Sequence, residues 1–153
     1  MSLEICNVTK RFHRGRRGML AGDSFTALDD VSIKVARGAS FGLVGESGSG
    51  KTTLTRCILR LEKLTSGTIR FDGEDIHALS AAGMRRLRAR MQIVFQDPYA
   101  SLNPRMTVHD IVAEPLVIHH DTLGLSPRRR TERVVELLLQ VGLQTEHLFR
   151  YPH

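Results

Sequence analysis

The sequence predicts an α/β fold in which a mixed sheet surrounds a glycine-rich loop and the helix that follows it. The short apolar run Ser40–Val44 before the loop is typical of a buried strand. Apolar residues after the loop recur at helical spacing, at positions 54, 57, 58 and 61. Alternating strand patterns dominate up to Gln96, and helical patterns follow it. Together these three observations indicate strands and helices around one central loop.

The glycine-rich loop itself fits the pattern G-x-x-x-x-G-K-[ST], as Gly45-Glu46-Ser47-Gly48-Ser49-Gly50-Lys51-Thr52. A strand before it and a helix after it favour a phosphate-binding site over an incidental glycine-rich turn. Glycine permits the tight path that exposes successive backbone amides, and a helix N-terminus favours anions. We expect Lys51 to contact the β and γ phosphates of a nucleotide and the Thr52 hydroxyl to bind Mg²⁺.

Length and composition indicate one soluble domain. The chain has 153 residues, of which 41% are hydrophobic and 25% are charged. Its apolar runs are far shorter than the ~20 residues that cross a bilayer, and its N-terminus lacks the apolar core of a signal peptide. We therefore expect a cytoplasmic protein in which Cys6 and Cys57 are reduced, buried thiols rather than a disulfide.

The charge is basic, with a formal net charge of +6. Arginines cluster near positions 14–17, 85–90 and 128–130, but the few aromatic residues do not interleave with them. A stacking platform for nucleic acid needs such interleaving. The clusters therefore favour solvated helix faces and a basic loop over a nucleic-acid surface.

Local patterns place elements along the chain. The first half is expected to contain a strand from Leu3 to Phe12, an exposed loop over 14–24, a strand over 31–35 closed by a turn at 36–38, a strand over 68–71 with a hairpin turn at Asp72-Gly73, a helix over 81–90 and a strand over 91–95.

The second half begins with a proline-containing loop over 97–104. Thr107 is expected to cap a helix that runs through Val112 and that Pro115 ends or kinks. Ser126 and Pro127 start another helix, and Gly142 stops it. Its apolar face is expected to comprise Val134, Leu137, Leu138 and Val141.

Several stretches outside the loop resemble one family. They are Ile93–Arg105, Glu114-Pro115-Leu116, Val141-Gly142-Leu143 and Tyr151-Pro152-His153. Across essentially the whole chain, the sequence resembles the ATP-binding subunits of ABC transporters, in the oligopeptide, dipeptide and nickel importer subfamily. The resemblance implies a P-loop NTPase fold with an antiparallel β edge and a helical subdomain. It places a nucleotide-binding core at residues 1–96 and the subdomain at 97–153.

The resemblance also implies site residues. Phe12 matches the aromatic that stacks on adenine, although a core phenylalanine is the competing interpretation. Gln96 matches the glutamine that contacts Mg²⁺ and the attacking water, so that Lys51 and Gln96 are the catalytic candidates and Thr52 and Gln96 the metal ligands. The expected nucleotide contacts are Phe12, Gly45, Glu46, Ser47, Gly48, Ser49, Gly50, Lys51, Thr52 and Thr53.

The function implied by the resemblance is ATP binding and hydrolysis that drives import of peptides or a related solute such as nickel. Implied partners are transmembrane permease subunits, a second ATP-binding subunit and, indirectly, a solute-binding protein. The expected location is the cytoplasmic face of the inner membrane. The helices after Gln96 match the subdomain that receives a coupling helix from the permease.

The chain ends at Tyr151-Pro152-His153, which in this family lies just ahead of the serine-glycine-glycine-glutamine signature. Because the acidic strand and the catalytic glutamate follow that signature, we expect nucleotide binding from this chain and hydrolysis from a full-length parent. An incomplete sheet is expected to expose a strand edge that favours association.

Three other functions remain open from the residues: a small-molecule kinase, a nucleic-acid-associated ABC ATPase and a non-catalytic nucleotide-binding fragment. A kinase would leave the stretch after Gln96 unexplained. His119-His120-Asp121 is a weak metal pattern that favours a loop between helices, and Asp29-Asp30 is typical of a strand start.

Overall fold

The structure is a computed structural model that describes residues 2–13, 24–97 and 99–153. The chain forms two compact units, Met1–Met84 and Arg85–His153, and each is described by itself. The basic stretch 14–17 and most of the loop expected over 14–24 lie outside the described residues.

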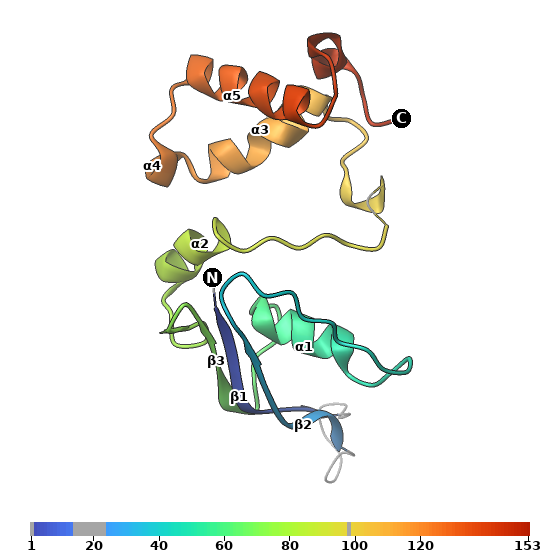
Figure 1. Ribbon diagram of the computed structural model, residues 1–153, viewed down its shortest axis with the longest axis vertical. Helices are drawn as coiled ribbons and strands as arrows, with labels where there is room; N and C mark the ends of the chain where they lie inside the picture. The colour runs from blue at the N-terminus through green and yellow to red at the C-terminus, as the bar shows by residue number, and fades with distance from the viewer. Residues whose placement is uncertain (1, 14–23, 98) are drawn as a thin grey trace, which may run out of the picture. The chain divides into compact units, whose positions relative to one another are not determined.

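The first unit is built on an antiparallel sheet with the strand order β2-β1-β3-β4 (Figure 1). Its strands are β1 (Leu3–His13), β2 (Ser24–Val35), β3 (Ser66–Phe71) and β4 (Glu74–Asp75). β2 begins at Ser24 and is longer than the expected strand over 31–35, because the segment before Val31 continues to pair with β1. The register brings Glu4 opposite Lys34, whose side chains form an ion pair of 2.9 Å.

The hairpin turn between β3 and β4 is confirmed. Asp72 and Gly73 both adopt positive φ, at 48° and 84°. Two such residues form the tight turn whose twist matches that of the flanking strands. Arg70 and Phe71 consequently pair with Asp75 and Glu74.

The helix after the glycine-rich loop is α1 (Lys51–Ile58), with Leu54 and Cys57 buried in the core of the first unit. It ends earlier than its apolar spacing predicts. Arg60 has a positive φ of 53°, so the chain leaves the helix before Leu61, which is exposed. The buried members of this core are Ile5, Val8, Leu28, Leu54, Cys57, Ile69, Phe71 and Ile76.

The two cysteines differ in burial: Cys57 is buried and Cys6 is exposed. Both are free thiols, as expected, and burial raises the pKa of Cys57. Cys6 is exposed, which contradicts its expected burial. It directly follows the buried Ile5 in β1, and successive side chains of a strand point to opposite faces of the sheet, so Cys6 faces away from the core.

Two expected strands are not formed. Residues 39–46 and 91–95 lie outside regular secondary structure, and Val44 and Val94 are 93% and 90% exposed. A strand exists through hydrogen bonds to a neighbour, and the sheet seen in the described residues comprises only β1 to β4. The apolar pattern was present in both runs, but a partner strand was not.

The second unit is helical. The helix α2 (Ala81–Arg88) agrees with the expected helix over 81–90 and contains the boundary between the units. A 3₁₀ turn, η1 (Tyr99–Ser101), follows it. Then follow α3 (Val108–Ile118), α4 (His120–Leu123), α5 (Pro127–Gln140) and the 3₁₀ turn η2 (Thr145–Phe149). The core of this unit comprises Ala113, Val134, Leu138 and Leu148.

Side-chain caps start the two longer helices. Thr107 Oγ1 accepts from the amide of Asp110 at 3.2 Å, and Ser126 Oγ accepts from the amide of Arg129 at 3.3 Å. α5 ends at Gln140, and the amide of Leu143 then donates to Leu138 O at 2.9 Å. These capping predictions are confirmed.

Three details of this unit differ from expectation. α3 does not end at Pro115 but continues to Ile118, because packing of its apolar face against α5 outweighs the hydrogen bond that proline cannot donate. Val141 is exposed, since it follows the last turn of α5 and no longer lies on its buried face. The stretch His119–Asp121 enters the short helix α4 rather than a loop.

Candidate functional site

The glycine-rich loop and the N-terminus of α1 border a hollow of about 470 Å³ in the first unit. Its lining residues come from β2, from the loop and from the first turn of α1: Phe25, Ala27, Ser47, Gly48, Gly50, Lys51, Thr52 and Thr53. The hollow thus combines polar loop atoms on one side with two apolar side chains of β2. Such a mixture fits a ligand with one charged and one apolar end.

Gly50 is required by its surroundings. It caps α1 with a φ of 94°, and a Cβ built on it would lie 2.5 Å from Ala27 O and 3.0 Å from Leu28 Cδ2. A side chain at this position would meet the backbone of β2. Glycine therefore lets the start of α1 approach the sheet closely.

Lys51 folds back over its own loop. Its Nζ donates to Gly45 O at 2.7 Å, to Glu46 O at 2.6 Å and to Ser49 Oγ at 3.1 Å. An ammonium group has three N–H donors, so these contacts use its full capacity. A phosphate oxygen that binds Lys51 must therefore replace at least one contact within the loop.

The start of α1 supplies further donors. The first hydrogen bond of the helix runs from the amide of Leu54 to Gly50 O at 2.9 Å, so the amides of the preceding turn have no acceptor within the helix. The Thr52 side chain is exposed beside them and Thr53 is half-buried. Gly45 has no side chain, and a Cβ added to it would lie only 2.8 Å from Ser49 Oγ, which is too close. This arrangement suits an anion with several oxygens.

Comparison with known proteins identifies the family. The family described as ABC transporter matches residues 28–151, which is most of the chain. The chain belongs to the ABC transporter family. The region matched includes the whole glycine-rich loop and its helix.

Two curated relatives of this ABC protein carry transport names. The chain is 51% identical over 128 residues to the oligopeptide transport ATP-binding protein OppF of Bacillus subtilis (strain 168), covering 83% of this chain and 41% of that protein. It is 46% identical over 155 residues to the dipeptide transport ATP-binding protein DppF of Lactococcus lactis subsp. cremoris (strain MG1363), covering 99% of this chain and 47% of that protein. The chain therefore spans about half the length of these relatives.

Solved structures confirm the fold of this ABC protein. The post-hydrolysis dimer of the ATP-binding cassette MJ0796, bound to ADP and Pi, matches with a TM-score of 0.75 and 26% identity, covering 98% of this chain and 61% of that one. The structure of cbiO1 from Clostridium perfringens matches with a TM-score of 0.72 and 25% identity, covering 97% and 53%. The expected P-loop α/β fold is confirmed at the level of these cassettes.

Phe12, the expected adenine contact, lies near the end of β1 and is half-buried. The ammonium group of Lys10 lies over its ring, 4.5 Å from the centroid. In the β1–β2 register, Phe12 is paired with Phe25, and it is Phe25 that lines the hollow. Sequence reasoning missed Phe25, although Phe25 and Ala27 are two positions apart and therefore lie on the same face of β2.

Gln96 lies in a bend of the second unit and is exposed. The residues that line the hollow all belong to the first unit. The structure thus gathers Gly45–Thr53 and Phe25 within one unit, whereas Gln96 belongs to the other. The pairing of Gln96 with Mg²⁺ stays a prediction.

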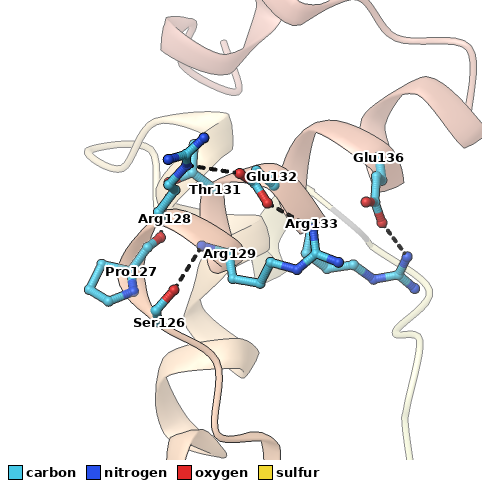
Figure 2. Close-up of polar contacts among 8 residues, drawn as sticks. All are labelled: Ser126, Pro127, Arg128, Arg129, Thr131, Glu132, Arg133 and Glu136. Carbon is cyan, nitrogen blue, oxygen red and sulfur yellow. Dashed lines mark hydrogen bonds and ion pairs between the residues drawn. The ribbon is translucent and has the colours of Figure 1, made fainter.

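Three arginines of α5, Arg128, Arg129 and Arg133, bind carboxylates on the same helix, as Figure 2 shows. Glu132 accepts from Arg128 Nε at 3.1 Å and from Arg129 Nη1 at 2.8 Å, and Arg133 Nη1 donates to Glu136 at 2.8 Å. The hydrogen bonds from Arg129 and then Arg128 lower the pKa of Glu132. The cluster is a solvated helix face with interleaved charges of both signs.

Within residues 2–13, 24–97 and 99–153, no three histidine, cysteine, aspartate or glutamate side chains gather as a metal site. His120 Nδ1 lies 3.8 Å from Asp121 Oδ1 at the start of α4. The helices found over the same residues are all too short or too polar to cross a bilayer.

Proposed function

We propose that this chain binds ATP together with Mg²⁺ in the hollow between the glycine-rich loop and β2. The triphosphate contacts Lys51 and the amides that begin α1, and Thr52 is the Mg²⁺ ligand. The base lies on the apolar side, against Phe12 and Phe25. The observation that carries this proposal is that Lys51, Thr52 and Thr53, at the start of α1, line the same hollow as the loop glycines Gly48 and Gly50.

The residues fit these ligands. Gly45 and Gly48 leave the loop without side chains where phosphate oxygens must approach, and the added Cβ of Gly48 would meet no atom within 4 Å. Magnesium prefers hard oxygen ligands and retains waters, which an exposed threonine hydroxyl permits. When bound, the metal supplies charge that neutralises the phosphate oxygens. The remaining proposed nucleotide contacts of the loop and of the start of α1 are Glu46, Ser47, Ser49 and Thr53.

In the longer parent protein, we propose that ATP binding and hydrolysis drive import of a peptide or a related solute through an ABC transporter. The names of the oligopeptide and dipeptide transport relatives support this substrate class. Gln96 is then the contact to Mg²⁺ and to the attacking water. Permease subunits and a second ATP-binding subunit are the proposed partners, at the cytoplasmic face of the membrane.

Calorimetric titration of the chain with MgATP tests the proposal. We expect measurable binding that Lys51→Ala weakens at least tenfold, because a charge-assisted hydrogen bond contributes about 1.5–3 kcal/mol. Lys34→Ala is the matched control: it removes the same charge from an exposed side chain paired with Glu4, away from the hollow. Equal affinities for Lys51→Ala and the unmodified chain would contradict the site.

A further inference from the structure

Lys10 is a charged side chain inside the first unit. It lies in β1 and is only 9% exposed, and among the described residues it is the one charged side chain that is buried. A buried ammonium group loses its hydration, so it persists only where partners replace the lost water. Its partners therefore indicate why it is there.

Three partners surround the ammonium group. Lys10 Nζ lies 3.1 Å from Glu62 Oε2 and donates to Lys63 O at 2.9 Å. It also lies over the Phe12 ring, 4.5 Å from the centroid. Glu62 and Lys63 follow α1, whose other end carries the glycine-rich loop. One side chain thus links the strand that bears Phe12 to the segment that leaves the loop helix.

We propose that Lys10 is a positioning residue for the nucleotide base, acting through Phe12. This inference rests on the proposed ATP site. Glu62 and Lys63 fix the ammonium group, and a fixed cation over one face of an aromatic ring orients that ring. The opposite face of Phe12 is then presented to the base, beside Phe25, with which Phe12 is paired across the strands.

The contacts separate this role from phosphate binding. Phe12, Glu62 and Lys63 all lie outside Gly45–Thr53, whereas Lys51 Nζ donates to three atoms of that loop. A change at Lys10 should therefore alter recognition of the base and leave recognition of the triphosphate unchanged. A purely structural role would weaken both equally.

The test compares MgATP with magnesium tripolyphosphate, which lacks the base, by calorimetry on the 153-residue chain. Lys10→Met keeps the length of the side chain and removes its charge. We expect a loss of about three- to tenfold in ATP affinity, the range that a desolvated cation–π contact permits, with tripolyphosphate affinity unchanged within about twofold. Lys10→Arg, which restores the cation, should recover ATP affinity.

A second substitution tests the route through the ring. Phe12→Leu should lower ATP affinity and not tripolyphosphate affinity, and adding Lys10→Met to it should cause little further loss. Independent effects in the double variant would overturn the proposal. If Lys10→Met does not fold, as judged by circular dichroism, Glu62→Gln replaces it and must show the same selective loss.

The outcomes distinguish this inference from the proposed function. Equal losses for both ligands with Lys10→Met would make Lys10 structural and overturn the inference, while the ATP site would stand. If the unmodified chain binds neither ligand, or if Lys51→Ala binds both as well as the unmodified chain does, the proposed function itself fails.

Discussion

At the scale of single residues, the loop is held closed by its own lysine. Lys51 bonds two carbonyl groups and one hydroxyl of the residues just before it, which keeps the chain curved without a ligand. The cost of this arrangement is that a phosphate must displace a partner. The loop is therefore shaped in advance, but its key donor must be redirected on binding.

Gly50 allows a sharper residue-level prediction. Gly50→Ala should destabilise the first unit by roughly 2–4 kcal/mol, because alanine adds left-handed strain to a 2.5 Å approach to Ala27 O. Gly48→Ala is the matched control, since Gly48 has a similar φ of 85° but open space around its Cβ position. It should cost only about 1–2 kcal/mol. Urea unfolding monitored by circular dichroism measures both, and equal losses would refute the packing argument.

Local structure was predictable where the signal is local. The loop pattern correctly predicted a helix directly after Gly50, because loop and helix form from neighbouring residues, whereas the strand expected before the loop is not formed. Phe25 was missed because its importance comes from a neighbouring strand: it faces the hollow only once β2 pairs with β1. The burial of Lys10 could not be predicted either, since its polar partners Glu62 and Lys63 lie more than fifty positions along the chain.

At the scale of elements, the helices of the second unit carry their own start and stop signals. The hydroxyls of Thr107 and Ser126 accept from a backbone amide in the first turn of α3 and α5, and both starts were predicted from the sequence. Strands 40–44 and 91–95 failed for the opposite reason. Their apolar pattern is real, but a parallel strand needs a neighbour that is distant in sequence.

The start of α3 predicts a pH-dependent stability. Hydrogen bonds from His109 and then Thr107 lower the pKa of Asp110 below its ordinary value of 3.8. A carboxyl group whose pKa is lowered by folding stabilises the native state above that ordinary value, and the contribution is lost as the pH falls through the folded pKa. Asp110→Asn should therefore be less stable than the unmodified chain at neutral pH, with the difference vanishing in acid.

Urea titrations between roughly pH 6 and pH 2 measure this difference. Asp121→Asn is the control, because it removes an equal charge from a side chain that is 90% exposed, and it should lower stability less at neutral pH. A gap for Asp110→Asn that stays constant or widens in acid would show that the carboxylate does not stabilise α3.

At the scale of the whole molecule, two apolar segments are open to solvent. Residues 40–44 contain Phe41, Leu43 and Val44, and residues 91–95 contain Ile93, Val94 and Phe95, all exposed. Extended, unpaired segments of this kind pair readily with other chains. Because the chain spans about half the length of its curated relatives, we propose that further strands cover these segments in a protein of the relatives' full length.

Self-association tests this interpretation. Val94→Lys should lower the average mass that sedimentation measures at high protein concentration, because a charge on a 90% exposed position opposes edge pairing. Val141→Lys adds the same charge at a 72% exposed position outside both segments, and it should have little effect. Similar masses for the two variants would place association elsewhere.

The claim on which the account depends is that the loop Gly45–Thr53 binds the triphosphate of ATP. A crystal structure of the chain with Mg²⁺ and a non-hydrolysable ATP analogue tests it most directly. We predict phosphate oxygens within hydrogen-bonding distance of Lys51 Nζ, which gives up at least one of its loop contacts, and Thr52 beside the metal. An analogue bound elsewhere, with Lys51 still bonded to Gly45, Glu46 and Ser49, would contradict the account.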